Sequence, residues 1–219
     1  MVNPVVAPPT PIEIRLLRRN ELPADTVALA RFLIGKVVVR ELPNARLSGR
    51  IVETEAYPRG DPAAHHYIGP TPRNRSMYLR RGHAYVYFSY GNHFMLNVSA
   101  EIEGVGGGVL IRALEPVEGL DQMKLNRQTH EIKELTRGPG RLARALQIDR
   151  SLDGTDLCAP GPLWLGRLAV SKQFRAGGQS VLLRIGKSRR IGISRAAHRL
   201  LRFYESGNPF VSGPARLRH

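Results

Sequence analysis

The pattern of hydrophobic and polar positions predicts a short helix and a hairpin in the first quarter of the chain. Residues 27–34 are mostly apolar, with Pro23 before them and Gly35 after them, which is typical of a helix with proline in its first turn and glycine past its end. Residues 37–42 and 47–57 have the pattern of strands, and turn-forming residues join them. We expect these two segments to pair as an antiparallel hairpin.

Further strands are expected in the middle and at the end of the chain. Two strand-like segments, 83–89 and 94–99, flank a turn at 90–93, and another strand is expected at 108–114, after the glycine-rich residues 104–108. Shorter strands are expected in the last third of the chain, near 166–170, 181–185 and 200–204.

Two more helices and one long loop complete the expected elements. Helical periodicity covers 118–127 and 138–147. Residues 58–82 are rich in proline, glycine and arginine and should form a surface loop with a helical turn at 62–66, and loops of this length are usually functional. We expect an α+β protein with a mostly antiparallel, curved sheet, peripheral helices and long loops.

Length and composition indicate one globular domain. The 219 residues, 42% of them hydrophobic, suffice for one domain with a sizeable core and are too few for two. We expect residues 1–12 to be a flexible, proline-rich tail and residues 13–219 to be the domain. No run of about 18 apolar residues offers a membrane span, and the first residues lack the pattern of a secretory signal. A cytoplasmic protein is expected.

The charge of the chain indicates a polyanionic partner. Subtracting 18 acidic from 33 basic residues gives a net charge of +15, which is spread along the chain. Lysine occurs only at positions 36, 124, 133, 172 and 187, so arginine carries nearly all of the positive charge. The planar guanidinium of arginine suits bidentate contacts with phosphate. The composition favours nucleic acid as the partner, and a merely soluble basic surface is the alternative.

The second hairpin strand carries two acids close together. Alternation along a strand predicts two faces, with Glu53, Glu55 and Tyr57 on one and Val52, Thr54 and Ala56 on the other. A carboxylate near a strand end, beside an aromatic ring, is a candidate general base. Such an anion would also stabilise the sugar cation that forms when a bond to a sugar carbon is hydrolysed. A solvated strand face is the alternative.

Aromatic side chains gather in the sequence around the same strands. Tyr57, His65, Tyr85, Tyr87 and Tyr90 offer flat surfaces on which a base taken out of a duplex is held by stacking. Ordinary packing within a sheet is the alternative for each of them. Alternation in 83–89 again predicts two faces, with His83, Tyr85, Tyr87 and Ser89 on one and Ala84, Val86 and Phe88 on the other.

Metal sites are not expected. The single cysteine, Cys158, excludes an intramolecular disulfide, a cysteine-rich zinc site and a cysteine-ligated iron–sulfur cluster, and should be an ordinary half-buried thiol. Glu53, Glu55, His65 and His66 include good ligand types, but their spacing matches no metal-binding motif.

Two segments that contain glycine are candidates for binding phosphate. Residues 186–188 match the end of a nucleotide-binding loop, but Val181 stands where that loop needs its first glycine, which excludes this interpretation. The helix expected after Gly138 presents backbone N–H groups to a phosphate, with Arg137 and Arg141 adding charge. An ordinary helix start is an equal alternative.

Longer motifs resemble those of one protein family. They are RIVETEAY at 50–57, AAH at 63–65, TPRNR at 71–75, YVY at 85–87, YG at 90–91, Asn97, IRALEP at 111–116, GPG at 138–140, RFY at 202–204 and PFVS at 209–212. In this order they closely resemble the alkyladenine DNA glycosylase family, also called the 3-methyladenine or methylpurine DNA glycosylase family. The resemblance covers about residues 25–212 and is very specific.

The resemblance implies a monofunctional DNA repair glycosylase. Such an enzyme flips an alkylated or deaminated purine out of duplex DNA and hydrolyses its N-glycosidic bond with an activated water, without a cofactor or metal, leaving an abasic site. We therefore expect double-stranded DNA with damaged purines as the partner, a monomer, and a location at the nucleoid in a bacterium or otherwise in the nucleus. The scarcity of lysine agrees with a water nucleophile. A non-catalytic basic nucleic-acid-binding protein that stacks bases on the same aromatic residues is the alternative.

The resemblance also implies roles for single residues. Glu55 matches the general base, and Arg112 matches the residue that helps to hold the water and the carboxylate. Glu53 matches no catalytic role. The arginines expected to contact the DNA backbone are Arg73, Arg75, Arg137 and Arg141.

The base pocket and the wedge follow from the same resemblance. Tyr57, His65 and Tyr87 match the pocket walls, and Asn97 matches the residue that crowds the amino group of normal guanine. Tyr90 matches the side chain inserted into the gap left by the flipped nucleotide. The sequence departs from the family pattern after the Tyr-Gly of the wedge turn, where Asn92 and His93 replace an apolar residue, so we expect a weaker wedge or one that hydrogen-bonds to the opposite strand.

Overall fold

The computed structural model describes residues 12–89, 91–169 and 183–217, apart from the side chain of residue 216. Tyr90, nearly all of the tail expected at 1–12, and positions 181 and 182 lie outside the described residues. The strand expected near 181–185 is therefore tested only from residue 183 onward.

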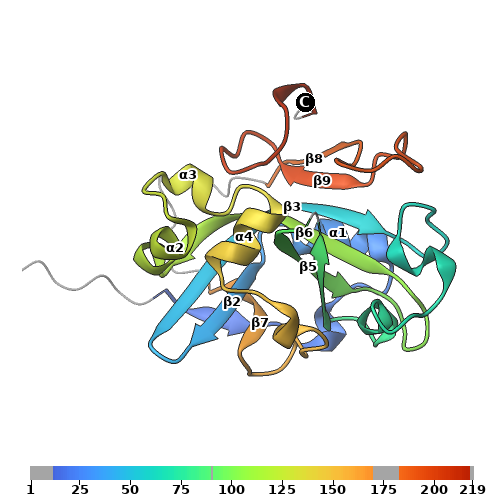
Figure 1. The fold of residues 1–219 in the computed structure, drawn as a ribbon, viewed down its shortest axis with the longest axis horizontal. Coiled ribbons are helices and arrows are strands. Elements are labelled where there is room, and N and C mark those ends of the chain that lie inside the picture. Colours follow the sequence, from blue (N-terminus) through green and yellow to red (C-terminus); the bar gives the residue numbers. More distant parts are fainter. Residues whose placement is uncertain (1–11, 90, 170–182, 218–219) are drawn as a thin grey trace, which may run out of the picture.

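One large sheet dominates the fold, and its pairings are antiparallel (Figure 1). Its nine strands in the described ranges are β1 (Ile14–Leu16), β2 (Val37–Leu42), β3 (Ala45–Tyr57), β4 (Ala84–Ser89), β5 (His93–Ser99), β6 (Gly108–Glu118), β7 (Leu163–Leu168), β8 (Ile185–Ser188) and β9 (Arg202–Glu205). They lie in the order β1, β7, β2, β3, β6, β5, β4, and β9 pairs with both β3 and β8. The β2–β3 and β4–β5 hairpins confirm the predicted pairings, and the mixture of sheet and helices confirms the predicted α+β class.

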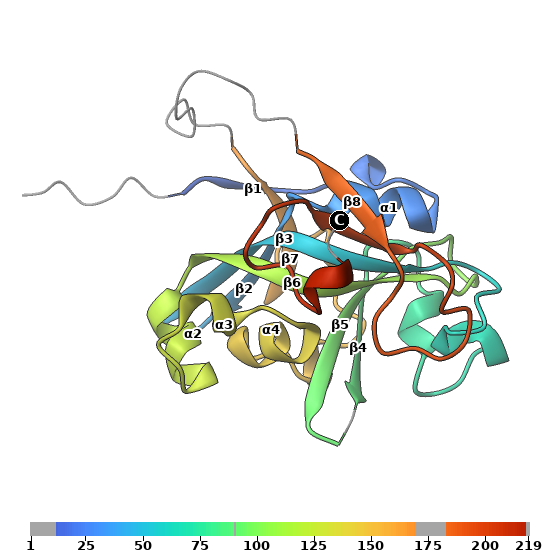
Figure 2. The same ribbon diagram turned by 90° about the horizontal axis from the view of Figure 1, so that it is seen from above.

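The helices surround this sheet, with α2, α3 and α4 grouped together and α1 apart from them (Figure 2). The α-helices of the described residues are α1 (Thr26–Leu33), α2 (Leu120–Arg127), α3 (Ile132–Leu135) and α4 (Pro139–Ala145). Short 3-10 turns occur at η1 (Arg19–Glu21), η2 (His65–Ile68), η3 (Arg75–Tyr78), η4 (Arg150–Leu152) and η6 (Ala215–Leu217). None of the helices in the described ranges is long and apolar enough to cross a membrane.

Two helix starts differ from the sequence prediction. Helix α1 begins after Asp25, whose carboxylate accepts a 2.7 Å hydrogen bond from the N–H of Ala28, so Pro23 precedes the cap instead of lying in the first turn. Gly35 follows the helix with a φ of +82°, as a glycine past a helix end does. Helix α2 begins at Leu120 and not at residue 118, because β6 continues to Glu118.

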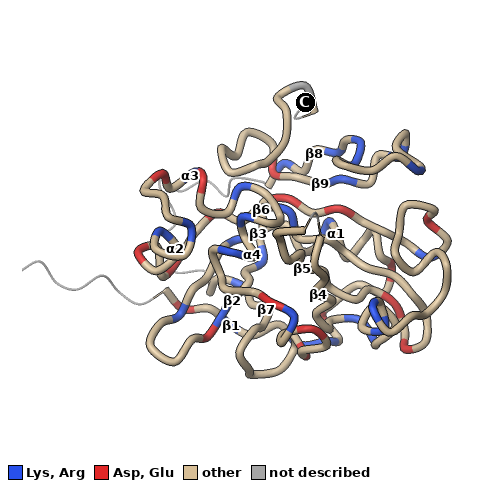
Figure 3. The backbone as a smooth tube through the Cα atoms, viewed as in Figure 1, with Lys and Arg blue, Asp and Glu red and all other residues tan. Residues whose placement is uncertain are grey.

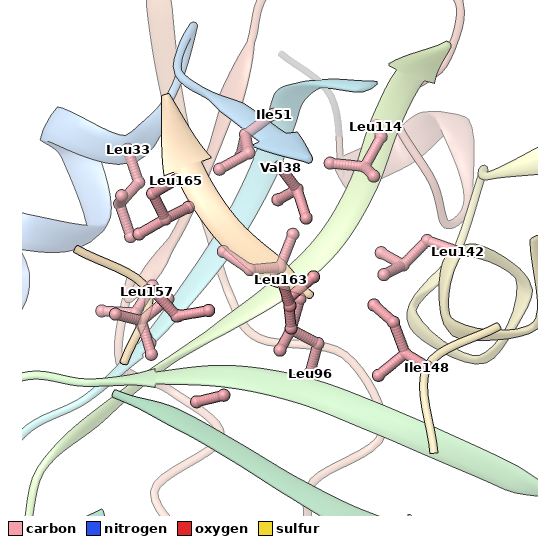
Figure 4. Packing of buried hydrophobic residues seen from close by; sticks show 14 of the residues in the cluster. Leu33, Val38, Ile51, Leu96, Leu114, Leu142, Ile148, Leu157, Leu163 and Leu165 are labelled. Atoms are coloured by element: carbon pink, nitrogen blue, oxygen red, sulfur yellow. The ribbon is translucent and has the colours of Figure 1, made fainter. Parts of the chain in front are cut away.

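A hydrophobic core fills the space between the sheet and the helices (Figure 4). Leu33 of α1, Ile51 of β3, Leu96 of β5, Leu142 of α4 and Leu165 of β7 are among its members, and all are almost fully buried. Elements from every part of the described chain thus share one core, and burial of their apolar surface is the main stabilising contribution.

A double irregularity interrupts the pairing of β3 with β6. The register runs from Ile51 opposite Leu114 to Glu53 opposite Ala113 and then to Thr54 opposite Ile111. Val52 on one strand and Arg112 on the other are therefore skipped. Beyond this point the edge of β3 that paired with β2 pairs with β9 instead.

The bulge corrects the predicted alternation of β3. Thr54 and Ala56 do lie on the core side, since the Thr54 hydroxyl donates to a backbone carbonyl of α1 and Ala56 belongs to the core. Val52 lies on the opposite side, in a small cluster with Tyr204 and Val211. A bulge places two successive residues on the same side of a strand, so Val52 and its neighbour Glu53 share the face that also holds Glu55.

Candidate functional site

A cavity of about 250 Å³ lies beside the second half of β3. Six of the side chains around it are Tyr57, His65, Tyr85, Tyr87, Asn97 and Arg112. Pockets for drug-sized ligands measure about 300–1,000 Å³, so this cavity suits a single small group. It is lined by aromatic rings together with a few polar groups.

A buried carboxylate, that of Glu55, lies behind the cavity wall and contacts three of the residues that line the cavity. The Tyr57 hydroxyl donates to Oε2 over 2.8 Å, and the backbone N–H of Ile191 donates to Oε1 over 2.7 Å. Nη1 of Arg112 lies 3.2 Å from Oε1. A carboxylate accepts about four hydrogen bonds, so these donors from the described residues leave about one acceptor position for a water molecule.

Arg112 joins Glu55 to a second buried carboxylate. Its Nε donates to Oε1 of Glu53 over 2.9 Å. Burial alone would lower the pKa of Arg112, but the charges of Glu55 and Glu53 outweigh it and raise the pKa above the ordinary value. Burial alone would raise the pKa of Glu53, but the charges of Arg112 and Arg202 outweigh it and lower that pKa. Arg112 and Glu53 are therefore both ionised near neutral pH.

Glu53 does not line the cavity, and two of its partners belong to the C-terminal segment, which crosses β3 (Figure 2). It accepts a 2.7 Å hydrogen bond from Nε of Arg202 and a 2.6 Å hydrogen bond from the N–H of Ser212. Arg202 is fully buried and also donates to the carbonyls of Ser212 and Leu217. Glu53 thus ties β3 and Arg112 to the end of the chain.

Three aromatic side chains pack against one another in the cavity wall. The ring centroids of His65 and Tyr87 are 4.5 Å apart in an edge arrangement, and those of Tyr85 and Tyr87 are 5.3 Å apart and stacked. Burial, with the nearby charges of Arg73 and His66, lowers the pKa of His65, so its imidazole is neutral at pH 7. Burial raises the pKa of the Tyr85 phenol, so the phenol stays protonated, and its oxygen lies 3.0 Å from Nδ1 of His65, within hydrogen-bonding distance.

The loop at 58–82 holds His65 in place. Asn74 is buried, and its amide donates to the carbonyls of His65 and Gly69 over 2.9 and 3.0 Å. The helical turn predicted at 62–66 forms slightly later, as η2 at His65–Ile68. The loop is therefore an ordered part of the cavity wall.

Strand β4 presents its residues as the alternation predicted. Tyr85, Tyr87 and Ser89 line the cavity, whereas Ala84 and Val86 belong to the core on the other side. Asn97 of β5 lies opposite Tyr85 in the ladder and donates to its carbonyl over 3.2 Å. Tyr90, the expected wedge, lies outside the described residues.

Lysine and arginine residues are spread over the described elements (Figure 3). The four arginines that were expected to contact the DNA backbone lie in different surroundings. Arg73 and Arg75 are exposed on the loop beside the cavity. Arg137 donates to a backbone carbonyl over 3.0 Å, and Arg141 forms an ion pair with Glu134. The charges of Arg73 and Arg75 are thus more available to an external anion than the charge of Arg141.

His93, a departure from the family pattern, contacts helix α4. A Cβ atom built on Gly140 would lie 2.7 Å from Cγ of the His93 ring, which shows how closely the ring approaches the helix. His93 therefore packs the β4–β5 hairpin against the start of α4.

The potential metal ligands have other partners. Among the residues that the structure describes, no group of three or more His, Cys, Asp or Glu side chains is placed to hold a metal ion. Glu53 and Glu55 face Arg112, and Nε2 of His66 lies 3.1 Å from a backbone carbonyl. Cys158 is half-buried, as expected, and burial raises the pKa of its thiol to about 11.

Sequence reasoning missed the segment that contains Ile191. Its N–H reaches a carboxylate 136 positions earlier in the chain. A backbone donor has no sequence signature, and contacts over such a distance depend on the path of the folded chain. Arg190, which precedes Ile191, and its partner Asp61 were missed for the same reason.

Comparison with known proteins identifies the family of the chain. The family model described as methylpurine-DNA glycosylase (MPG) matches residues 20–209. A protein of Mesorhizobium japonicum is 59% identical over 202 residues, which are 92% of this chain and 92% of the relative. A relative from Paraburkholderia phytofirmans is 49% identical over 92% of this chain and 90% of its own length. A relative from Methanoculleus marisnigri is 46% identical over 86% of this chain and 94% of its own length. All three bear the name "Putative 3-methyladenine DNA glycosylase". The chain belongs to the methylpurine-DNA glycosylase family.

Proposed function

We propose that Glu55 activates the water molecule that hydrolyses the N-glycosidic bond of a methylated purine flipped out of duplex DNA. The activity, that of a DNA-3-methyladenine glycosylase in base excision repair, follows from the family and from the identity with its members. The assignment to Glu55 is supported above all by its position, since it is a buried carboxylate bound by three residues that line a small aromatic cavity. The alternative of a non-catalytic binding protein has no support in these findings.

The chemistry follows from the charges that develop at the sugar. As the bond between C1′ and the base lengthens, the sugar gains positive charge, which a nearby carboxylate stabilises. The same carboxylate takes the proton of the water that attacks C1′. Arg112 holds Glu55 in place and orients it, and Tyr57 donates to its other oxygen.

The aromatic wall favours methylated purines. A purine alkylated at N3 or N7 is cationic, and a cation over an aromatic face is stabilised by about 0.5–2 kcal/mol. Such a base is already a good leaving group and needs little acid catalysis. The pKa values of the Tyr57 and Tyr85 phenols are raised, chiefly by burial, so these phenols are poor proton donors for a neutral base such as hypoxanthine.

The DNA is held by the basic surface, and Tyr90 fills the gap left by the flipped nucleotide in this proposal. The net charge of +15 supports binding to the phosphate backbone. The protein works as a monomer wherever the genome lies, at the nucleoid of a bacterium or in the nucleus.

The proposal is tested by the variant Glu55→Gln. Methylated duplex DNA is incubated with the purified protein and a chelator, and free 3-methyladenine and alkali-labile abasic sites are measured. The variant should release no purine while it still binds the lesion. Glutamine keeps the shape of the side chain but cannot take the proton of the water. Glu103→Gln, the same change at an exposed glutamate, is the control. Normal turnover by Glu55→Gln would exclude Glu55 as the base, and tight binding without release by the unaltered protein would contradict the activity itself.

A further inference from the structure

The segment between β8 and β9 reaches the cavity, although most of it is exposed. It consists of residues 189–201, of which Arg190 alone is buried. The next residue, Ile191, donates its N–H to Glu55, and Ile191 and Ile193 line the cavity. A single buried side chain thus anchors the part of the segment that contacts the carboxylate.

The buried side chain forms an ion pair with Asp61 of the loop at 58–82. Nη1 and Nη2 of Arg190 donate to Oδ2 and Oδ1 of Asp61 over 2.6 and 3.1 Å, and both side chains are fully buried. Nη1 also donates to the carbonyl of Ala56 over 3.0 Å. Such a bidentate pair fixes the direction of the guanidinium as well as its position.

The same guanidinium lies against Tyr57. Its central carbon is 4.5 Å from the centroid of the Tyr57 ring, and the hydroxyl of that ring donates to Glu55. Arg190 is therefore next to Ile191 in the chain and stacked on Tyr57 in space. These two residues supply two of the donors that hold Glu55.

A contribution to stability alone does not account for this pair well. Removing two charges from water is costly, and apolar residues of similar volume often stabilise a fold as well as a buried ion pair does or better. A buried pair does, however, define geometry, because its partners must meet in one arrangement. The geometry defined here is that of the donors to Glu55.

We propose that Arg190 and Asp61 form a positioning pair that holds the Ile191 N–H and the Tyr57 hydroxyl on the carboxylate of Glu55. Neither residue touches the reacting atoms. The pair acts on the hydrolytic step through Glu55, so its kinetic effect rests on the function proposed above.

The test compares Arg190→Met, Arg190→Lys and the double variant Asp61→Asn with Arg190→Met. The double variant covers the case in which an unpaired Asp61 prevents folding. The rate of 3-methyladenine release is measured in single turnover with enzyme in excess, and the Kd is measured for a duplex that contains a stable abasic analogue. We expect release to slow about 10- to 100-fold in both methionine variants, because small displacements of catalytic groups cost about this much. The Kd should stay near that of the unaltered protein, and the lysine variant should recover part of the rate.

Arg199→Gln is the matched control. Nη1 of Arg199 lies 3.9 Å from the same Asp61 oxygen, but this side chain is 44% exposed, and no contact with Tyr57 or Ile191 is found within the described residues. It should release base at the normal rate. An unchanged rate in the folded methionine variants, or equal losses of rate and binding, would overturn the positioning role.

A spectroscopic measurement separates this inference from the proposed function. The Ile191 amide proton bonds to a carboxylate, so its NMR resonance should lie downfield and should move upfield in Arg190→Met and in the double variant. If the unaltered protein released no base, the proposed function would fail while this shift still tested the pair. An Ile191 resonance that did not move would overturn the pair.

Discussion

Glu53 and Arg112 form a buried ion pair across the irregular part of the β3–β6 ladder. Nε of Arg112 donates to Oε1 of Glu53 over 2.9 Å. The side chain of Arg112 is 8% exposed and that of Glu53 is 0% exposed. With its Nε held in this way, the guanidinium presents Nη1 to Glu55. Glu53 thus orients the arginine without reaching the cavity.

Glu53→Gln should destabilise the protein in a pH-dependent manner. The pKa of Glu53 lies below its ordinary value of 4.5, so its ionised form stabilises the fold above about pH 4.5, and this contribution is lost as the pH falls through the lowered pKa. At pH 7 the variant should lose about 3–5 kcal/mol of the free energy of unfolding, since it leaves buried arginine charges without their partner. Denaturant titrations of both proteins at several pH values measure this difference. It should shrink below pH 4.5, and a difference that does not change with pH would contradict the assignment.

Tyr90→Ala should weaken base flipping more than nonspecific binding. A side chain in the gap stabilises the flipped state, whereas nonspecific affinity comes mainly from phosphate contacts. A fluorescent base analogue beside the lesion reports flipping, and anisotropy with undamaged duplex reports nonspecific binding. Tyr67→Ala removes a tyrosine that is 51% exposed and serves as the control. Equal losses in the two assays would argue against a wedge.

Arg75→Gln should reduce the salt dependence of DNA binding more than Arg141→Gln does. Both changes remove one positive charge, but Arg141 is already paired with Glu134 and Arg75 is exposed. Loss of one phosphate contact lowers the slope of log K against log salt concentration by about 1. Anisotropy titrations with a duplex at several salt concentrations measure the slopes. Equal slopes for the two variants would show that the pairing of Arg141 makes no difference.

Gly140→Ala should loosen the attachment of the β4–β5 hairpin to α4. The new Cβ would lie 2.7 Å from Cγ and 2.9 Å from Cβ of His93, atoms that a rotation of the ring alone does not move far enough. Overpacking of this kind costs about 1–3 kcal/mol of the free energy of unfolding. Gly161→Ala, where nothing lies within 4 Å of the added atom, is the control and should leave the thermal midpoint unchanged. If both variants melted at the same temperature, the contact between His93 and α4 would not contribute to the stability of the protein.

The sequence by itself determined the local helices and strands and the residues from which the candidate site is built. The β2–β3 and β4–β5 hairpins and the side on which Tyr85, Tyr87 and Ser89 lie follow from period-two alternation, which depends only on neighbouring residues. The motifs likewise indicated the family that the comparisons show. Element ends were less accurate, as with α2, because a strand that gains a pairing partner extends past its local signal.

Only the tertiary structure decided how the acids are used. Alternation placed Glu53 and Glu55 on one face, but the bulge that moves Val52 to that face and brings Arg112 between the two carboxylates depends on the register of β3 against β6. The roles of Glu53 and Arg190 depend on contacts with segments far away in the chain. Such contacts arise because a buried charge must find a partner wherever the folded chain brings one, and no local pattern records where that is.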